Sequence, residues 1–124
     1  LAPWAEGGKS DVGGMRMDAN GNTEFHGTLR ATEVKINAQW WSDFVFAEDY
    51  KLMSLGDVEN FIKQYKHLPQ MPSEKEVLEK GIDAADMLAI QQQKIEELTL
   101  YLIALKKEVD ALKKEHSSTS TLSH

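Results

Sequence analysis

The residue types that most often carry out chemistry are few in this chain and are poorly spaced for it. The four histidines are His26, His67, His116 and His124. They lack the short separations of metal-binding pairs, and there is no cysteine to join them as a ligand. The sequence also lacks a phosphate-binding loop and the Gly-x-Ser-x-Gly turn of serine hydrolases. We therefore expect no metal ion, no other cofactor and no enzyme activity.

Aromatic side chains form the densest cluster of potential contact residues. Two Trp and two Phe, four of the ten aromatic residues, fall within residues 40–46. Such a cluster favours the buried core of a small domain, because an exposed patch of this size would be adhesive. The alternative is an exposed surface that contacts a receptor or a glycan, with Trp40, Trp41 and Tyr50 as the candidate contact residues.

Length and charge argue against several classes of protein. A chain of 124 residues provides one modest domain or two small pieces. With 14 Lys and Arg against 20 Asp and Glu, the net charge of −6 disfavours binding to nucleic acid or to anionic membranes. No apolar run is long enough to span a bilayer. Residues 1–14 are predicted to be a glycine-rich linker without signal-peptide features, so the sequence reads as a segment of a longer protein.

Residues 15–39 are predicted to form a β segment. The Asn20-Gly21 dipeptide is a strong signal for a tight turn between two strands. The alternation of apolar residues changes parity between Ala31 and Val34, which indicates a bulge or two short strands. One chain has too few large apolar residues here to bury a core. We therefore expect this segment to pair with copies from other chains in a β shaft.

Residues 40–83 are predicted to form a small head with two short helices. Ser54 and Ser73 each begin a capping box, in which the Ser side chain binds the backbone amide three residues later. The first helix is expected to bury an apolar stripe and to end before Pro69. That stripe consists of Leu55, Val58, Phe61, Ile62 and Tyr65. The second helix is expected to end at Gly81.

A long helix is predicted over residues 84–116, with Asp83 as its N-cap. Its apolar residues recur at alternating separations of three and four, which is the heptad repeat of a coiled coil. We call this set the heptad seam; it consists of Leu88, Gln91, Ile95, Leu98, Leu102, Leu105, Val109 and Leu112. Gln91 is its polar member, and such a residue can fix the register of the helices. The polar tail, residues 117–124, is predicted to be disordered.

The residues beside the heptad seam bear on the number of chains. Leu100, Tyr101 and Ile103 add apolar surface, which suits a helix with more than one neighbour. Glu108 and Lys113 are spaced for an ion pair between parallel helices. These features favour a parallel homotrimer over a dimer. The other interpretation, a helix folded back on its own head, would leave much of a rod of about 45 Å uncovered.

Several segments together resemble a known family. They are residues 22–36, the Asp-Tyr-Lys-Leu stretch at 49–52, the His-Leu-Pro-x-x-Pro-Ser connector at 67–73, and the Glu-Glu-Leu-Thr-Leu-Tyr run at 96–101. Over roughly residues 15–115 the chain is similar to the C-terminal tail fibre domain of fibre and surface proteins from Bacteroidetes-type bacteria and their phages. That group is in turn similar to the endosialidase-type intramolecular chaperone domain.

The resemblance implies a homotrimer at the distal end of a fibre, which aligns three chains so that the preceding β shaft can fold. Some members of the family cleave themselves at a serine that is followed by aspartate and, shortly after, by basic residues. Ser42 and Asp43 match the pair, but Val45 and Ala47 stand where the basic residues are expected. Alignment on the Asp-Tyr-Lys stretch instead places Glu48 at the serine position. Ser42 is thus a weak candidate nucleophile, and an ordinary turn or edge residue is the preferred interpretation.

The sequence therefore predicts an α+β protein with a short intersubunit β segment, a small helical head and a long C-terminal coiled-coil helix, in a parallel homotrimer. The predicted function is trimerisation and folding of a fibre or surface protein, with the upstream shaft of the same chain as a further partner. A receptor- or glycan-binding fibre tip is the alternative, and a self-cleaving serine peptidase is the third hypothesis. The expected location is extracellular, at a cell surface or on a phage virion.

Overall fold

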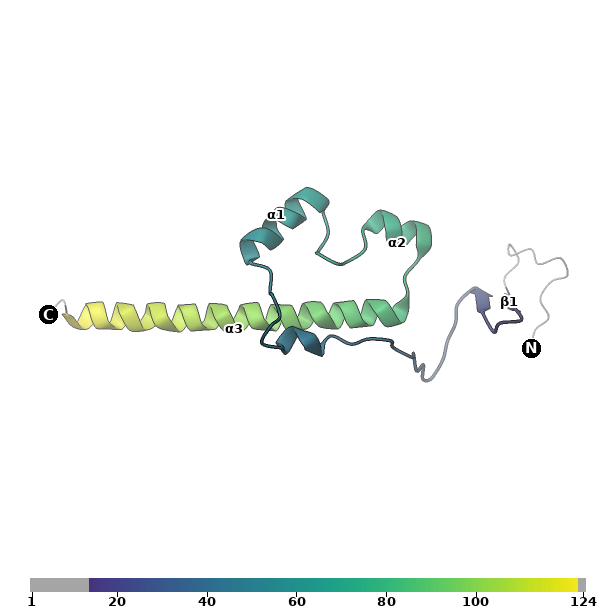
Figure 1. Ribbon diagram of the computed structural model, residues 1–124, viewed down its shortest axis with the longest axis horizontal. Helices are drawn as coiled ribbons and strands as arrows, with labels where there is room; N and C mark the ends of the chain where they lie inside the picture. The colour runs from purple at the N-terminus through teal and green to yellow at the C-terminus, as the bar shows by residue number, and fades with distance from the viewer. Residues whose placement is uncertain (1–13, 123–124) are drawn as a thin grey trace. The chain divides into compact units, whose positions relative to one another are not determined.

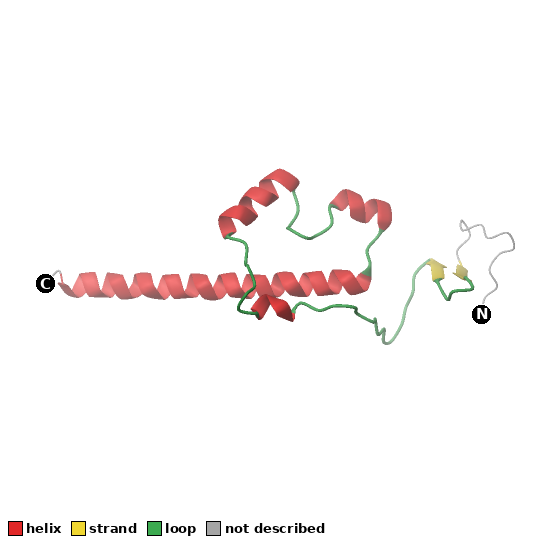
Figure 2. Ribbon diagram, viewed as in Figure 1, coloured by secondary structure: helices red, strands yellow, loops and turns green. Residues whose placement is uncertain are grey.

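The computed structural model of the protein describes residues 14–122 and divides the chain into two units. The first unit ends at Lys35 and contains two strands, whereas the second begins at Ile36 and contains the helices (Figures 1 and 2). Apart from Gly14, the predicted linker lies outside the described residues. The α+β class is confirmed, with a small antiparallel sheet and a long C-terminal helix.

The first unit is a β-hairpin. Strand β1 (Gly14–Met17) pairs antiparallel with strand β2 (Thr23–His26), in a register that places Met15 opposite Phe25. Phe25 is about half exposed, because a two-stranded sheet has no second layer to cover it. The hairpin of a single chain therefore has no core of its own, as its composition predicts.

The turn of the hairpin is organised by the carboxylate of Asp18. Its Oδ1 accepts hydrogen bonds from the backbone N of Asn20 and of Asn22, both at 2.9 Å. The Nδ2 of Asn22 donates to Oδ2 at 3.0 Å, and this bond is the main reason why the pKa of Asp18 lies below its ordinary value. Gly21 has a φ of 87°, which glycine adopts without the strain of a side chain. The predicted turn is therefore present, with Asp18 closing it.

The strands are shorter than the predicted β segment. Strand structure ends at His26, and residues 27–39 form neither the bulged strand nor the second short strand that the change of parity suggests. Leu29 and Val34 in this stretch are more than three-fifths exposed. All side chains of residues 27–39 are exposed, so among the described residues no packing contact selects a register for this stretch.

The second unit consists of η2 (Asp43–Phe46), α1 (Leu55–Tyr65), α2 (Glu74–Lys80) and α3 (Ala84–Leu122). Helix α3 continues past the predicted end at residue 116, so residues 117–122 of the predicted disordered tail are helical. The C-terminal part of α3 projects beyond η2, α1 and α2 (Figure 1). The rest of the predicted tail, residues 123–124, lies outside the described residues.

The three predicted helix starts are confirmed by their hydrogen bonds. The side chains of Ser54, Ser73 and Asp83 each accept a bond from the backbone N three positions later, at 3.1, 3.2 and 3.1 Å respectively. Helix α2 ends before Gly81 as predicted, with a φ of 73° there. Helix α1 ends before Lys66, whose φ of 64° places a non-glycine residue in the left-handed region. These local signals fix the boundaries of the helices.

The core of the second unit is small and lies between η2 and α3. Among the described residues, the fully buried apolar side chains are Val45 and Ala89. The prediction that the aromatic cluster forms this core is wrong in the single chain, since Trp41, Phe44 and Phe46 are about half exposed. Because η2 is a single turn, only the side that carries Val45 can face α3, and its aromatic neighbours point elsewhere.

The predicted burial of the α1 stripe is also wrong for the single chain. No residue of α1 is buried, and the side chains of Leu55, Ile62 and Tyr65 are exposed. Helix α1 has the apolar and polar sides of an amphipathic helix, and the rings of Phe61 and Tyr65 contact each other and His67, but these contacts do not bury the apolar side. The unit therefore leaves apolar surface on α1 as well as on α3.

Candidate functional site

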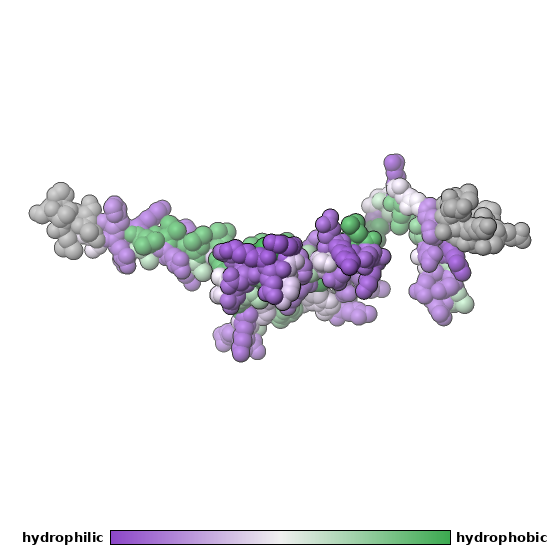
Figure 3. Space-filling view, turned by 90° about the horizontal axis from the view of Figure 1, so that it is seen from above, coloured by the Kyte–Doolittle hydropathy of each residue, from purple (hydrophilic) through white to green (hydrophobic). Residues whose placement is uncertain are grey.

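The heptad seam runs along one side of α3 and is uncovered. Its apolar members are exposed by between 37% and 66% of their side-chain surface, and Gln91 is exposed as well. Figure 3 shows apolar surface on the part of α3 that projects beyond the head. Monomeric proteins seldom leave a long row of large apolar side chains in water. The heptad seam is therefore the principal candidate for an interface.

A second stripe on α3 faces the head. It consists of Ala89, Gln93, Glu96 and Leu100, which are again three or four residues apart; the first three are buried and the fourth is half-buried. The two stripes share no residue. Helix α3 can therefore pack against its own head and still present the whole heptad seam, so the two interpretations of the long helix are compatible.

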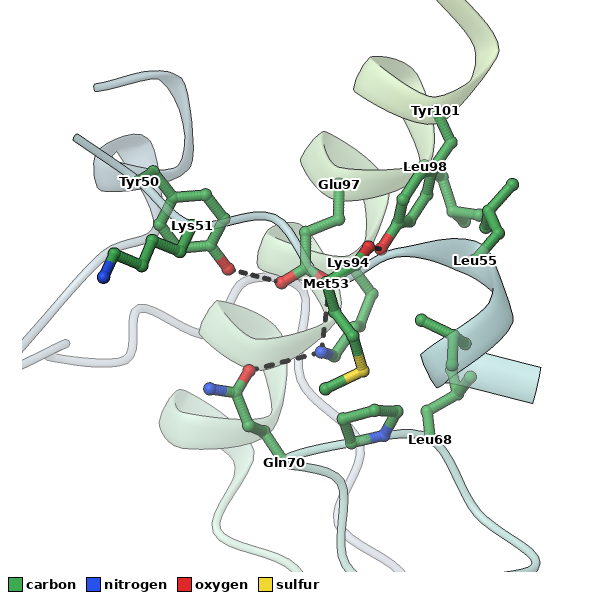
Figure 4. A pocket seen from close by; sticks show the side chains of 12 residues that line it. Tyr50, Lys51, Met53, Leu55, Leu68, Gln70, Lys94, Glu97, Leu98 and Tyr101 are labelled. Atoms are coloured by element: carbon green, nitrogen blue, oxygen red, sulfur yellow. Dashed lines mark hydrogen bonds and ion pairs between the residues drawn. The ribbon is translucent and has the colours of Figure 1, made fainter. Parts of the chain in front are cut away.

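Polar side chains around Glu97 hold the head to α3. The Tyr50 hydroxyl donates to Glu97 Oε1 at 2.7 Å, and Gln93 Nε2 donates to the same oxygen at 3.1 Å. Lys94 Nζ lies 3.2 Å from Glu97 Oε2, with only 12% and 14% of the two side chains exposed. The Oε1 of Gln70 accepts from Gln93 at 2.6 Å and from Lys94 at 3.2 Å (Figure 4). We call these five residues the Glu97 network.

Burial and charge act in opposite directions on the pKa of Glu97 but in the same direction on the pKa of Tyr50 and of Tyr101. Burial works to raise the pKa of Glu97, but the hydrogen bonds from Tyr50 and Gln93 and the charge of Lys94 outweigh it, so the pKa lies below its ordinary value. Burial raises the pKa of Tyr50, and its bond to Glu97 adds to the effect. Burial and the charge of Glu97 raise the pKa of Tyr101 in the same way. The folded state therefore favours a carboxylate at Glu97 and neutral phenols beside it.

Two of the three candidate tip residues take part in attaching the head. Tyr50 belongs to the Glu97 network, and Trp40 Nε1 donates to Asp86 Oδ1 at 3.1 Å. Trp41 is half exposed. The structure thus brings Trp40 and Tyr50 to α3, and Trp41 is the candidate whose ring remains most available to a ligand.

Ser42 is buried at the start of η2. Its hydroxyl donates a hydrogen bond to the carboxylate of Glu96, which is also buried, and its carbonyl accepts from Val45 N at 3.0 Å. A carboxylate in this position can accept the proton of a serine hydroxyl. The same bond also satisfies two polar groups that η2 and α3 bury together, and that structural role needs no reaction.

A pocket of about 220 Å³ lies beside the Glu97 network. Its walls come from the N-terminal end of α1, the connector at residues 68–70 and α3, and they are mainly apolar (Figure 4). Leu55 and Leu68 line it from the head, and Leu98 and Tyr101 line it from α3. Leu98 is also a member of the heptad seam, so pocket and seam are continuous.

No pattern in the sequence predicted a role for Gln70, Gln93, Lys94 or Glu96. These polar residues hold the head by bonds between segments 23 to 54 residues apart, which no local pattern reveals. One signal was present: the separations of four, three and four along the second stripe of α3 begin at Ala89, a residue small enough for close packing.

Neither a protein-family profile, nor a curated protein, nor a solved structure significantly matches the chain. None of the helices within residues 14–122 has the length and apolar character needed to cross a membrane. Over the same described residues, no three His, Cys, Asp or Glu side chains converge as a metal site would require. Function is therefore inferred from the heptad seam, the Glu97 network and the pocket beside it.

Proposed function

We propose that this chain is a self-association and folding module that forms a parallel homotrimer at the end of a fibre or surface protein. The observation that carries the proposal is the uncovered heptad seam, which continues for several turns beyond the head. A strict heptad repeat matches the 3.5-residue period of supercoiled helices, so another α3 is its natural partner. The acidic net charge of −6 also argues against nucleic acid as the partner.

The exposed area of the chain supports a partner. A compact monomer of 14.0 kDa is expected to expose about 6,700 Å², whereas this chain exposes 10805 Å². Residues 1–13 and 123–124 can contribute at most about 2,500 Å² of that total, so an excess of about 1,600 Å² remains. A standard protein–protein interface buries about 800 Å² on each partner. The surplus is therefore large enough for contact with more than one neighbour.

The proposed mechanism is an increase in local concentration. Once the helices α3 of three chains associate, the β segments that precede them are tethered to one another at about millimolar concentration. Tethering removes most of the entropy cost that separate chains would meet on pairing. The exposed residues of the hairpin and of residues 27–39 would then find partners in the neighbouring chains and continue as the shaft.

The number of chains is the least constrained part of the proposal. Leu100 and Tyr101, which favoured a trimer in the sequence, are half-buried against the chain's own head and no longer require a third helix. Ile103 is exposed, and so is much of the α1 stripe. We retain the homotrimer because these surfaces lie outside the heptad seam and would stay wet in a simple two-helix pair.

An adjacent pair of substitutions tests the proposal. Leu105→Asp places a charge in the heptad seam beyond the head, whereas Ala104→Asp places the same charge one residue earlier, outside the seam. We expect light scattering to give about 42 kDa, three times 14.0 kDa, for the wild type and for Ala104→Asp. Leu105→Asp should be monomeric at micromolar concentration, because an unpaired carboxylate is costly to bury. An unchanged mass for both variants would remove the seam as the interface.

The exposed ring of Trp41 supports a second candidate function, a fibre tip that binds a receptor or a glycan. Aromatic faces at half exposure are common in such contacts, because they offer large area with little entropy to lose. If Trp41 serves this purpose, iodide should quench its fluorescence in the assembled protein, compared with a Trp41→Phe control. Near-complete protection of Trp41 after assembly would count against a tip and would place this residue in the subunit interface.

A further inference from the structure

The pocket beside Leu98 is incomplete in a single chain. The side chains of Met53, Leu55 and Leu68 line it, yet they are 39%, 58% and 41% exposed, and Leu98 is exposed by 63%. A pocket with such walls does not bury its own lining. Some apolar group from outside the unit is needed to exclude water from it.

Coiled-coil geometry says which surface of a neighbouring helix lies closest. In the heptad register of the seam, Lys94 and Tyr101 hold the position that flanks the seam on the side of the pocket. In a parallel coiled coil, residues in this position face those that flank the seam of the neighbouring helix on its opposite side. That opposite flank includes Thr99 and Lys106.

Ile103 lies on that same flank of α3. It follows Thr99 by four residues and precedes Lys106 by three, so the three side chains form one row. Ile103 is 46% exposed, whereas Glu96, two turns earlier on the same side of α3, is buried against the head. The Thr99 hydroxyl bonds to the Ile95 carbonyl at 2.8 Å, so this polar group is satisfied within its own helix. Ile103 thus offers apolar surface that no other part of residues 14–122 covers.

We propose that the pocket is completed by the α3 helix of a second copy of this chain, whose Ile103 side chain enters it between Leu55 and Leu98. This inference rests on the proposed self-association. It extends the interface from the heptad seam to the head, so that each head contacts helix α3 of the neighbouring chain. The exposed apolar residue at the start of α1 then acquires a role, because Leu55 forms the outer wall of the site.

A second copy fits the pocket better than a small molecule does. Leu98 belongs both to the seam and to the pocket wall, so any α3 helix that covers the seam also approaches the pocket. The excess exposed area of about 1,600 Å² is more than a narrow seam alone would use. A separate apolar ligand would have to share Leu98 with the partner helix.

The test uses the absence of cysteine from the chain. Full-length Leu55→Cys carrying one tag and Ile103→Cys carrying a larger tag are unfolded, mixed, refolded together and treated with a short bis-maleimide. We expect a cross-linked pair of the two tagged chains, at least about tenfold above the matched control. In the control, Leu78→Cys replaces Leu55→Cys; Leu78 is the more exposed residue at 78% but lies on α2, outside the pocket.

Light scattering on the same refolded samples separates the two proposals. A mass of about 42 kDa with cross-linking no greater than in the Leu78→Cys control would overturn the pocket assignment and leave self-association standing. A monomeric mass would overturn both. A small molecule found bound in the wild type by native mass spectrometry, and lost in Leu55→Asp, would also overturn the assignment if the cross-link is absent.

Discussion

The two parts of α3 differ in how their surface is used. Up to Tyr101, the helix carries the heptad seam on one side and a stripe that packs against the head on another. Beyond Tyr101, the seam continues but the second stripe has no counterpart, and the helix projects from the head (Figure 1). The first part is attached within the chain mainly by polar bonds, whereas the second exposes a row of large apolar residues among its charged side chains.

If α3 associates as we propose, this difference separates folding from assembly. Hydrogen bonds and ion pairs such as those of the Glu97 network require defined geometry, and they position the head on its own helix. Contacts between apolar rows depend less on exact geometry, and they stabilise roughly in proportion to the apolar area that they bury. A chain that uses polar contacts inside and keeps apolar contacts for its neighbours can adopt a defined fold before it meets them.

The largest effect is expected from two truncations that divide α3. A chain that ends at Tyr101 keeps the stripe and the Glu97 network but loses Leu102, Leu105 and the later seam residues. We expect it to be monomeric by light scattering while retaining helical circular dichroism from the head. A chain that ends at Met87 also loses the partners of Tyr50 and Ser42, so the head should unfold. If the shorter chain remains folded, the head does not depend on α3.

The next largest effect, on the free energy of unfolding, is expected from a pair of substitutions, one in each part of α3. Glu97→Ala leaves Lys94, which is nearly buried, without its counter-charge and removes the acceptor of Tyr50. We expect the free energy of unfolding to fall by about 2–4 kcal/mol. Glu108→Ala removes an exposed carboxylate from the projecting part and should change it by less than about 0.5 kcal/mol. Urea denaturation of both variants provides the comparison, and similar losses would contradict it.

Ser42 tests whether the buried bond between η2 and α3 is structural. Ser42→Ala leaves the Glu96 carboxylate without its donor, so we expect a loss of about 1–3 kcal/mol in the free energy of unfolding. Glu96→Gln retains an acceptor for the hydroxyl and should lose less. The intact mass of the wild type should stay unchanged during prolonged refolding. Fragments that divide at Ser42, and that disappear in Ser42→Ala, would instead support the self-cleaving hypothesis.

The smallest effect is a dependence of the head attachment on pH. Because the folded-state pKa of Glu97 lies below its ordinary 4.5, its contribution to stability is present above pH 4.5 and is lost as pH falls through the lowered pKa. The pKa of Tyr50 is raised above 10.0, so its contribution is present below pH 10.0 and is lost as pH rises through the raised value. Urea midpoints should therefore fall at both extremes. Glu97→Gln should flatten the acid limb and also weaken the alkaline limb, because the Glu97 carboxylate adds to the raised pKa of Tyr50 and of Tyr101. Tyr50→Phe should flatten mainly the alkaline limb.

Local signals in the sequence predicted the helices well. Ser54, Ser73 and Asp83 cap the helices where expected, since a cap depends on residues within one turn. The long helix follows from its repeat, and its extension to Leu122 reflects how weakly a polar sequence marks a helix end. The seam residues lie on one exposed side, as a heptad requires.

Long-range packing could not be predicted in the same way. The aromatic residues near η2 and the α1 stripe were expected to be buried, but they are largely exposed. Apolar periodicity shows that one side of an element packs against a neighbour, but it does not show which chain supplies that neighbour. The burial of Ser42, Gln93 and Glu96 was missed, since polar residues are usually exposed and their partners are distant in sequence. Both errors concern which side chains are buried within the single chain and which are left exposed.

The order of the elements along the chain has a consequence for synthesis. The seam residue Ile95 follows the end of β2 by 69 positions, so at 5–20 residues per second a ribosome needs about 3–14 s to make one after the other. During that interval the hairpin exists without the element that would align it. Its small number of large apolar side chains then becomes an advantage, because a nascent strand with little to bury has little reason to adhere to the wrong neighbour.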